Sequence, residues 1–173
     1  MPVPMQPLQW IGGLARGRMT IAPCPSFTAE ALQGTVLFWR QSGVDVVASL
    51  LCPHEVAALG LIREPELCAA VGMEFLTFPV PDHSVPESMR DTLAFALRLA
   101  GLLGKEKSVL IHCRAGIGRS VVLAACVLAL NGTPPDTAFA RIGLARGFPD
   151  VPEMAEQREW VFEFAERVPG LPR

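Results

Sequence analysis

The sequence predicts an α/β fold: a single domain over residues 1–173, with a mixed, largely parallel central sheet flanked by helices. Three observations favour this class. Apolar, β-branched segments alternate with helical patterns, which is the strand, helix, strand order of such sheets. Half of the 173 residues are hydrophobic, which is enough for a buried core. The 16 prolines and 15 glycines are spread along the chain, so we expect short loops within one unit.

The N-terminal elements are predicted from turn residues and periodicity. Residues 8–11 and 18–21 are short strand candidates around a Gly-Gly turn. Residues 28–41 have apolar side chains at helical spacing, begin at a threonine that can cap a helix, and are followed closely by Gly43. Residues 44–51 (VDVVASLL) are mostly apolar and rich in β-branched residues, as expected of a buried strand.

The middle of the chain continues the alternation. Residues 53–60 and 64–71 predict short helices, and residues 74–80 (EFLTFPV) predict a second buried strand. Residues 86–104 form the longest helical pattern. We expect Pro86 in its first turn and a glycine near its end, which are the usual places for these residues.

The C-terminal elements complete the expected layers. Residues 108–113 (SVLIHC) predict a third strand that runs directly into a glycine-rich turn and then into a helix over residues 120–129. Two further helices are expected over residues 134–145 and 152–168. Because binding sites of such sheets lie at the carboxyl ends of strands, the turn after residue 113 is the expected site.

Composition excludes several classes of protein. Lys and Arg number 15, and Asp and Glu number 17, so the net charge of −2 argues against a general nucleic-acid or anionic-membrane binder. The longest apolar run, residues 121–130, is well short of the roughly 20 residues that span a membrane. Residues 1–10 lack the basic start and apolar stretch of a signal peptide. We therefore expect a soluble, cytoplasmic protein.

The five cysteines indicate free thiols. Their number is odd, no Cys-x-x-Cys pair occurs, and their spacing fits neither a disulfide framework nor a zinc site. We therefore expect reduced thiols, no metal and no other cofactor, with the cysteines at positions 24, 52, 68 and 126 as structural residues. Cys113 differs because it begins the glycine-rich turn.

The turn reads His112-Cys113-Arg114-Ala115-Gly116-Ile117-Gly118-Arg119-Ser120. A strand-to-helix loop can point several backbone N–H groups inward and so form an anion cradle with the helix N-terminus. The two glycines permit a tight curve, and the planar guanidinium of Arg119 matches two phosphate oxygens. A thiol in this positive environment ionises readily. We therefore expect Cys113 to be a nucleophile beneath a bound phosphoryl group.

This segment matches His-Cys-x-x-Gly-x-x-Arg-Ser/Thr at all specified positions, and it resembles the cysteine-dependent protein tyrosine phosphatase superfamily. It is not the nucleotide-binding P-loop, because the lysine is missing and a cysteine is present. The length of the chain is similar to that of compact dual-specificity phosphatases, particularly the bacterial and kinase-associated-phosphatase-like members.

The resemblance also implies a general acid. Residues 80–86 (VPDHSVP) are similar to the acid loop of tyrosine-specific phosphatases, which has Trp where this chain has Val80 and Gly where it has Ser84. Asp82 matches the acid. In the implied mechanism Cys113 attacks phosphorus while Asp82 protonates the leaving oxygen, and Asp82 then acts as base when water attacks the phosphocysteine. Arg119 and the loop amides hold the phosphoryl oxygens throughout.

The remaining candidate residues have supporting roles. The Ser120 hydroxyl is expected to hydrogen-bond the Cys113 sulfur, and His112 is expected to orient the loop. Gln157 matches, in an unfixed register, a glutamine that positions the hydrolytic water in tyrosine-specific phosphatases; the alternative is an exposed helix residue. Arg141 and Arg146 could contact substrate at the pocket mouth or lie on the solvated surface.

These features predict a phosphomonoester hydrolase, specifically a protein tyrosine phosphatase with possible dual specificity, acting on phosphoproteins. One alternative within catalysis is a phosphatase for a small phosphorylated metabolite, an inositol phosphate or an RNA 5′ end. An alternative of another class is a non-catalytic phosphoprotein-binding module, but such a module has no need of a nucleophile.

Overall fold

A four-stranded parallel sheet forms the centre of the computed structural model, which describes residues 5–25 and 28–170. Its strands are β1 (Arg18–Ala22), β2 (Val46–Ser49), β3 (Glu74–Thr77) and β4 (Ser108–His112), in the order β1-β4-β2-β3. All three pairings are parallel, so the predicted α/β class is confirmed and the sheet contains no antiparallel strand within these residues. Ala22 and Ser49 both pair with His112, which aligns the carboxyl ends of three strands.

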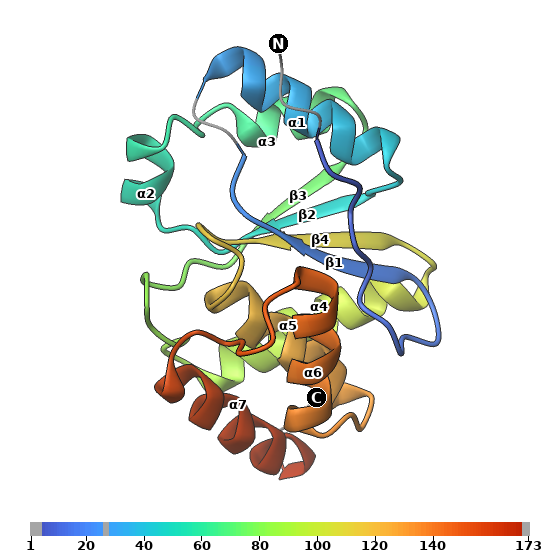
Figure 1. Ribbon diagram of the computed structural model, residues 1–173, viewed down its shortest axis with the longest axis vertical. Coiled ribbons are helices and arrows are strands. Elements are labelled where there is room, and N and C mark those ends of the chain that lie inside the picture. The colour runs from blue at the N-terminus through green and yellow to red at the C-terminus, as the bar shows by residue number, and fades with distance from the viewer. Residues whose placement is uncertain (1–4, 26–27, 171–173) are drawn as a thin grey trace.

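The helices cover both faces of the sheet (Figure 1). One face carries α1 (Ala29–Gln41) and α3 (Glu64–Ala70), with α2 (Pro53–Ala58) near the carboxyl ends of the strands. The other face carries α4 (Met89–Gly104), α5 (Arg119–Leu130), α6 (Pro135–Arg146) and α7 (Ala155–Arg167), followed by the short 3-10 helix Val168–Gly170. The helices flank the sheet as predicted.

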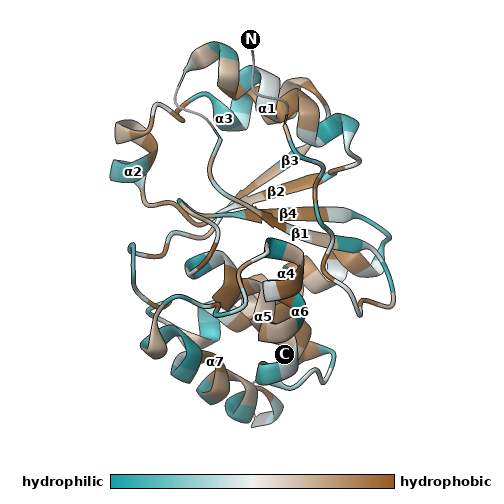
Figure 2. Ribbon diagram, in the orientation of Figure 1, coloured by the Kyte–Doolittle hydropathy of each residue, from teal (hydrophilic) through white to brown (hydrophobic). Residues whose placement is uncertain are grey.

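The two faces of the sheet contribute to separate hydrophobic cores, because successive side chains along a strand point to opposite faces. In β2, Val46 and Ala48 belong to the cluster on the α5 side, whereas Val47 belongs to the cluster on the α1 side. Burial on both faces explains why these strands are apolar throughout. Figure 2 shows the hydrophobic residues concentrated on the strands and on α5.

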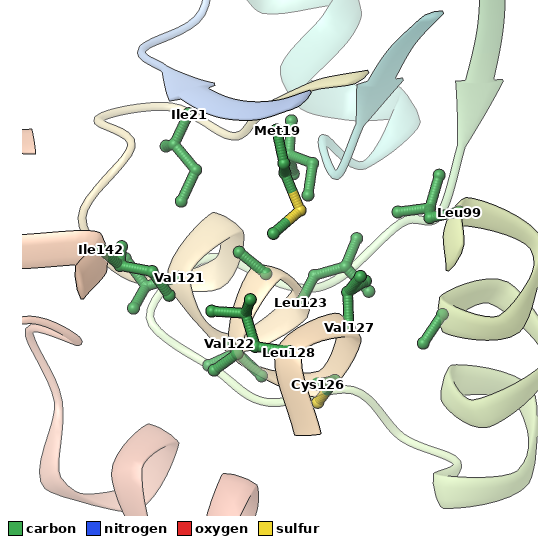
Figure 3. Packing of buried hydrophobic residues seen from close by; sticks show 14 of the residues in the cluster. Met19, Ile21, Leu99, Val121, Val122, Leu123, Cys126, Val127, Leu128 and Ile142 are labelled. Carbon is green, nitrogen blue, oxygen red and sulfur yellow. The ribbon is translucent and has the colours of Figure 1, made fainter. Parts of the chain in front are cut away.

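Helix α5 is the most deeply buried helix of the fold, and it begins at the glycine-rich turn. Its first ten residues, Arg119 to Leu128, are all buried, since the helix contacts α4, α6 and α7 as well as the sheet. Figure 3 shows its side chains against Met19 and Ile21 of β1, Leu99 of α4 and Ile142 of α6. The turn that precedes α5 is thus fixed to a rigid element.

Two predicted boundaries are wrong for identifiable reasons. Residues 8–11 form only an isolated antiparallel bridge from Trp10 to Thr20, because Pro7 and the Gly-Gly turn leave too short a segment to extend the ladder. Helix α4 begins at Met89, because the Ser88 hydroxyl caps it by accepting a hydrogen bond from the Asp91 amide at 3.1 Å; Pro86 lies outside the helix.

The start of the last helix also differs from the prediction. Helix α7 begins at Ala155 and not at residue 152. The Glu153 amide instead donates a hydrogen bond to the Ile117 carbonyl at 3.0 Å, which holds this segment against the glycine-rich turn. The other predicted helices and strands are confirmed, with ends that differ by a few residues.

Over the described part of the chain, every helix is too short or too polar to cross a bilayer.

Candidate active site

The glycine-rich turn joins β4 to α5 and surrounds Cys113. The thiol is 3% exposed, and its sulfur accepts a hydrogen bond from the Gly116 amide at 3.3 Å. Gly116 has φ +73°, and a Cβ at this position would lie 2.9 Å from the Ala22 carbonyl oxygen. Only glycine therefore permits this close approach of the turn to β1. The turn directs at least one backbone N–H group toward the thiol, as an anion cradle requires.

The other residues of the predicted phosphate loop form its rim. Arg114 and Ala115 are exposed, Ile117 is half-buried, and Gly118 is buried. The Arg114 carbonyl accepts a hydrogen bond from the Cys24 amide at 3.0 Å, which ties the rim to the segment after β1.

Arg119, the first residue of α5, extends a buried guanidinium along the pocket wall. Nη1 donates to Glu55 Oε2 and to the Val80 carbonyl, both at 2.8 Å. Nη2 donates to Glu55 Oε1 at 2.9 Å and to Asp82 Oδ1 at 3.0 Å. All four terminal N–H groups thus have protein acceptors.

Glu55 is the main partner of Arg119, and sequence reasoning missed it. Burial alone would raise the pKa of Glu55, but the hydrogen bonds from Arg119 and from the Cys52 amide hold that pKa below its ordinary value. Burial would likewise lower the pKa of Arg119, whereas the hydrogen bonds to Glu55 and the surrounding negative charges raise it. Both groups are therefore charged in the folded protein, and the guanidinium is held in one orientation.

Asp82 lies on the loop after β3, and the structure brings it to the same pocket as Cys113 and Arg119. Its Oδ1 accepts hydrogen bonds from Arg119 and from the His83 amide at 3.0 Å. A pocket of about 210 Å³ lies between these groups. Its lining residues are Asp82, His83, Cys113, Arg114, Ala115, Gly118, Arg119 and Glu153. A thiol, an arginine and a carboxyl group thus share one space large enough for a phosphoryl group.

His112 and Ser120 have different environments from one another. His112 is fully buried, with Nε2 at 2.7 Å from Glu64 Oε1 and Nδ1 at 3.2 Å from the Cys113 carbonyl oxygen. This geometry suits a residue that orients the turn. The Ser120 hydroxyl is buried and has no hydrogen-bond partner within residues 5–25 and 28–170. The predicted hydrogen bond from Ser120 to the Cys113 sulfur is therefore absent from this structure, in which Ser120 is the buried second residue of α5.

Gln157 is fully buried and not the exposed helix residue considered as the alternative. Its Nε2 donates to the Ser84 carbonyl at 3.0 Å, and its Oε1 accepts from the Met154 amide at 3.3 Å. It therefore connects the start of α7 to the loop that carries Asp82. Gln157 is not among the residues that line the pocket, whereas Glu153 of the same segment is.

The two arginines of α6 have separate roles. Arg146 donates from Nε to the Gly116 carbonyl at 2.9 Å and from Nη2 to the Ala115 carbonyl at 3.3 Å, so it supports the turn from outside. Arg141 instead lies against Gly13, which is distant in sequence from the turn. A Cβ on Gly13 would lie 2.2 Å from the Arg141 guanidinium. Neither arginine lines the pocket.

The remaining thiols are poorly suited to nucleophilic chemistry. All five cysteines are free. Burial raises the pKa of Cys24 and Cys52, raises that of Cys68 to about 12, and raises that of Cys126 well above the ordinary value. No three His, Cys, Asp or Glu side chains within the described segments are grouped to hold a metal ion.

Sequence reasoning missed Glu55, Glu64 and Glu153, and it named Arg146 only as a candidate for substrate contact. Glu55 is 64 residues from Arg119, and Glu64 is 48 residues from His112. Charged residues on two short helices carry no local signal of burial. Of these residues only Glu55 has a local signal, because it is the third residue of a helix after the N-cap position. That pattern indicates helix capping and not a partner for an arginine.

The chain is similar in sequence to known phosphatases. A family model described as "Polymorphic toxin system, DSP-PTPase phosphatase" matches residues 25–133. A protein of Invertebrate iridescent virus 3 named as tyrosine phosphatase 067L is 31% identical over 91 residues, which are 50% of this chain and 38% of the viral protein. Human tyrosine-protein phosphatase non-receptor type 4 is 42% identical over 57 residues, 30% of this chain and 6% of the human protein. The chain thus spans well under half the length of these relatives.

Two solved structures resemble the fold over most of its length. Kinase associated phosphatase superposes with a TM-score of 0.85 at 17% identity, covering 98% of this chain and 100% of that one. Tk-PTP in its active form has a TM-score of 0.71 at 25% identity, covering 93% and 97%.

Proposed function

Since this chain belongs to the DSP-PTPase phosphatase family of polymorphic toxin systems, we propose that it is a cysteine-dependent protein phosphatase. Its substrates in this proposal are phosphoproteins, with phosphotyrosine as the preferred residue. The observation that carries the proposal is the shared pocket of Cys113, Arg119 and Asp82, three groups that arrive from two separate loops. The names of the viral and human relatives, both tyrosine phosphatases, support a protein substrate over a small metabolite.

The proposed reaction has two steps. The Cys113 thiolate attacks phosphorus, the bond from phosphorus to the ester oxygen breaks, and Asp82 gives that oxygen its proton. Water then attacks the phosphocysteine, the phosphorus–sulfur bond breaks, and Asp82 takes the proton from water. Arg119 and the amides of the turn stabilise the phosphoryl oxygens in both steps.

The contact between Asp82 and Arg119 adds a requirement to this mechanism. Nη2 of Arg119 donates to Asp82 at 3.0 Å, and the other terminal N–H groups are held by Glu55 and Val80. Of these three acceptors, only Asp82 lines the pocket. A phosphoryl oxygen that takes a hydrogen bond from Nη2 of Arg119 must therefore displace the Asp82 carboxyl. We infer that substrate binding releases Asp82 from Arg119 toward the leaving oxygen.

Several finer roles belong to the same proposal. His112, paired with Glu64, orients the turn, and Arg114, Ala115, Gly116, Ile117 and Gly118 supply its backbone. A reduced Cys113 is required for attack, and the five free cysteines fit a reducing, cytoplasmic location. We propose no hydrogen-bonding role for Ser120, because its hydroxyl lacks the contact with sulfur on which that role depends.

The test is release of phosphate from a panel of phosphotyrosine peptides, phosphoserine peptides, phosphoinositides and nucleotides. Cys113→Ser should lower turnover by about a thousandfold or more while retaining binding of phosphotyrosine peptides. Cys24→Ser, which alters a half-buried thiol that neighbours the turn, is the matched control and should remain active. Binding of phosphopeptide by the wild type without turnover would instead indicate a binding module, and selective hydrolysis of phosphoinositides or nucleotides would indicate a different substrate class.

A further inference from the structure

The end of α6 and the loop after it expose apolar side chains beside the candidate pocket. Leu144 is 87% exposed and Phe148 is 47% exposed. Single exposed apolar residues are common on soluble proteins and need no explanation. These two are different because they border a series of hollows, one of which shares a wall residue with the catalytic pocket.

Three hollows follow one another and share lining residues. The catalytic pocket includes Glu153. A second hollow of about 130 Å³ is lined by Ile117, Phe148, Pro149, Asp150, Val151 and Glu153. A third of about 450 Å³ is lined by Ala140, Gly143, Leu144, Gly147 and Pro149. Glu153 lines both the first and the second hollow, and Pro149 lines both the second and the third. The second and third hollows together are here called the Leu144 groove.

The walls of the Leu144 groove are fixed to the catalytic turn. The Phe148 amide donates to the Gly143 carbonyl at 3.1 Å. A Cβ on Gly143 would lie 2.8 Å from the Phe148 carbonyl oxygen, so glycine allows this close approach. The Arg146 guanidinium lies 5.6 Å from the Phe148 ring and also binds the Gly116 carbonyl. The groove therefore keeps a set position relative to the pocket, which a recognition surface requires.

We propose that the Leu144 groove binds the polypeptide of a phosphoprotein substrate on one side of the phosphorylated residue. This inference rests on the proposed function. A phosphoresidue in the pocket directs the adjoining chain past Glu153 and over Phe148, and an apolar side chain of the substrate then packs on Leu144. Burial of that side chain supplies the affinity.

The charges along the path refine the expected substrate. Asp150 and Glu153 line the second hollow, which carries no basic side chain. Their carboxylates repel acidic residues next to the phosphoresidue and favour neutral or basic ones. The preferred sequence thus has a neutral or basic residue beside the phosphotyrosine and a leucine-like residue farther along on the same side. A second copy of this chain is a less suitable occupant, because it would cover the opening of the catalytic pocket.

The test compares small and peptide substrates in two variants. Leu144→Asp places a charge in the groove at a position outside the catalytic machinery, so folding and hydrolysis of phenyl phosphate should be unchanged. For phosphotyrosine peptides with leucine scanned through three positions on either side, wild-type kcat/KM should rise at one position on one side only. Leu144→Asp should remove that gain, about tenfold and mainly through KM. Ile62→Asp, at a 71% exposed position in the turn between α2 and α3, is the matched control.

Binding measurements separate this inference from the proposed activity. The same peptides are titrated into Cys113→Ser with and without Leu144→Asp, so the comparison does not depend on turnover. Equal affinity for phosphotyrosine peptides with leucine and with serine at the scanned position would overturn the inference. An equal loss of peptide affinity in the Ile62→Asp variant would also overturn it. Sedimentation of the wild type and Leu144→Asp is the final arm, since a dimer that dissociates only in Leu144→Asp would assign the groove to self-association instead.

Discussion

Glu55 of α2 holds both terminal nitrogens of Arg119 through two hydrogen bonds of 2.8 and 2.9 Å. The pair joins a short helix on one side of the sheet to the start of the central helix α5. A bidentate carboxylate fixes the plane of a guanidinium as well as its charge. The orientation of the arginine that faces the pocket is therefore set by a residue that does not line the pocket.

Removal of Glu55 should destabilise the fold and impair the site together. Glu55→Ala leaves the Arg119 charge buried with fewer acceptors, which costs about 3–5 kcal/mol in comparable buried pairs. Chemical denaturation should show this loss, and kcat/KM for phenyl phosphate should fall at a temperature where the variant remains folded. Glu66→Ala, which breaks the exposed pair with Arg63, should change neither measurement appreciably. Wild-type stability in Glu55→Ala would mean that the pair is not a structural requirement.

The same pair predicts a direction for acid denaturation. The folded state holds the pKa of Glu55 below its ordinary value, so the unfolded chain binds a proton at this carboxyl more readily. Its stabilising contribution is complete above about pH 4.3, the ordinary pKa of Glu, and is lost as pH falls through the lower, folded value. The free energy of unfolding of Glu55→Gln should therefore vary less with pH in this range than that of the wild type. Parallel curves would contradict the assignment.

Replacement of Asp82 should have opposite effects on chemistry and on phosphate binding. Loss of a general acid slows catalysis by about 10² to 10⁴, and the effect should be largest for poor leaving groups. Because Asp82 occupies Nη2 of Arg119, Asp82→Ala should also free that donor and tighten inhibition by inorganic phosphate. Asp82→Asn retains an acceptor for Arg119 and should tighten it less. An equal rate loss for all leaving groups would remove Asp82 from the role of acid.

Gln157 allows its two candidate roles to be separated. Gln157→Glu keeps the oxygen that accepts from Met154 but loses the donor to the Ser84 carbonyl, so it should loosen the loop that carries Asp82. The rate loss for poor leaving groups should then vanish in an Asp82→Ala background, which a double-mutant cycle measures. If Gln157 positions water instead, the variant should accumulate phosphocysteine and release a burst of leaving group.

The catalytic turn was predictable from sequence because its chemistry is contiguous. Cys113, Gly116 and Arg119 lie within one strand–turn–helix unit, so the short segment that joins them keeps the three residues close together in any fold. The apolar runs of β2, β4 and α5 likewise reflect burial on more than one side, which the alternation of strands and helices already indicates.

The partners of these residues were not predictable, because they depend on which elements the fold places side by side. The order β1-β4-β2-β3 brings α2 and α3 beside the turn, and with them Glu55 and Glu64. A glutamate on a short helix usually faces solvent, so its residue type misleads. The error at Ser120 has the same origin, since the direction of a hydroxyl depends on packing that the motif does not encode.

Arg146 should matter to the site although it lies outside the pocket. The carbonyl of Ala115 and the amide of Gly116 belong to one planar peptide unit and point in opposite directions. Arg146 binds that carbonyl at 3.3 Å while the amide donates to the Cys113 sulfur at 3.3 Å, so the arginine holds the amide toward the thiol. The neighbouring Gly116 carbonyl is held in the same way at 2.9 Å.

A lysine at this position can reach only one of the two carbonyls with a compact ammonium group. Arg146→Lys should therefore let a peptide unit of the turn rotate, weaken inhibition by inorganic phosphate and lower kcat/KM for phenyl phosphate, each by roughly tenfold, the equivalent of about one hydrogen bond. Arg141→Lys, on the same helix but against Gly13, is the matched control and should leave both quantities unchanged. If the two variants bind phosphate equally well, the amides of the turn keep their orientation without Arg146, and the turn is rigid through its glycines and α5 alone.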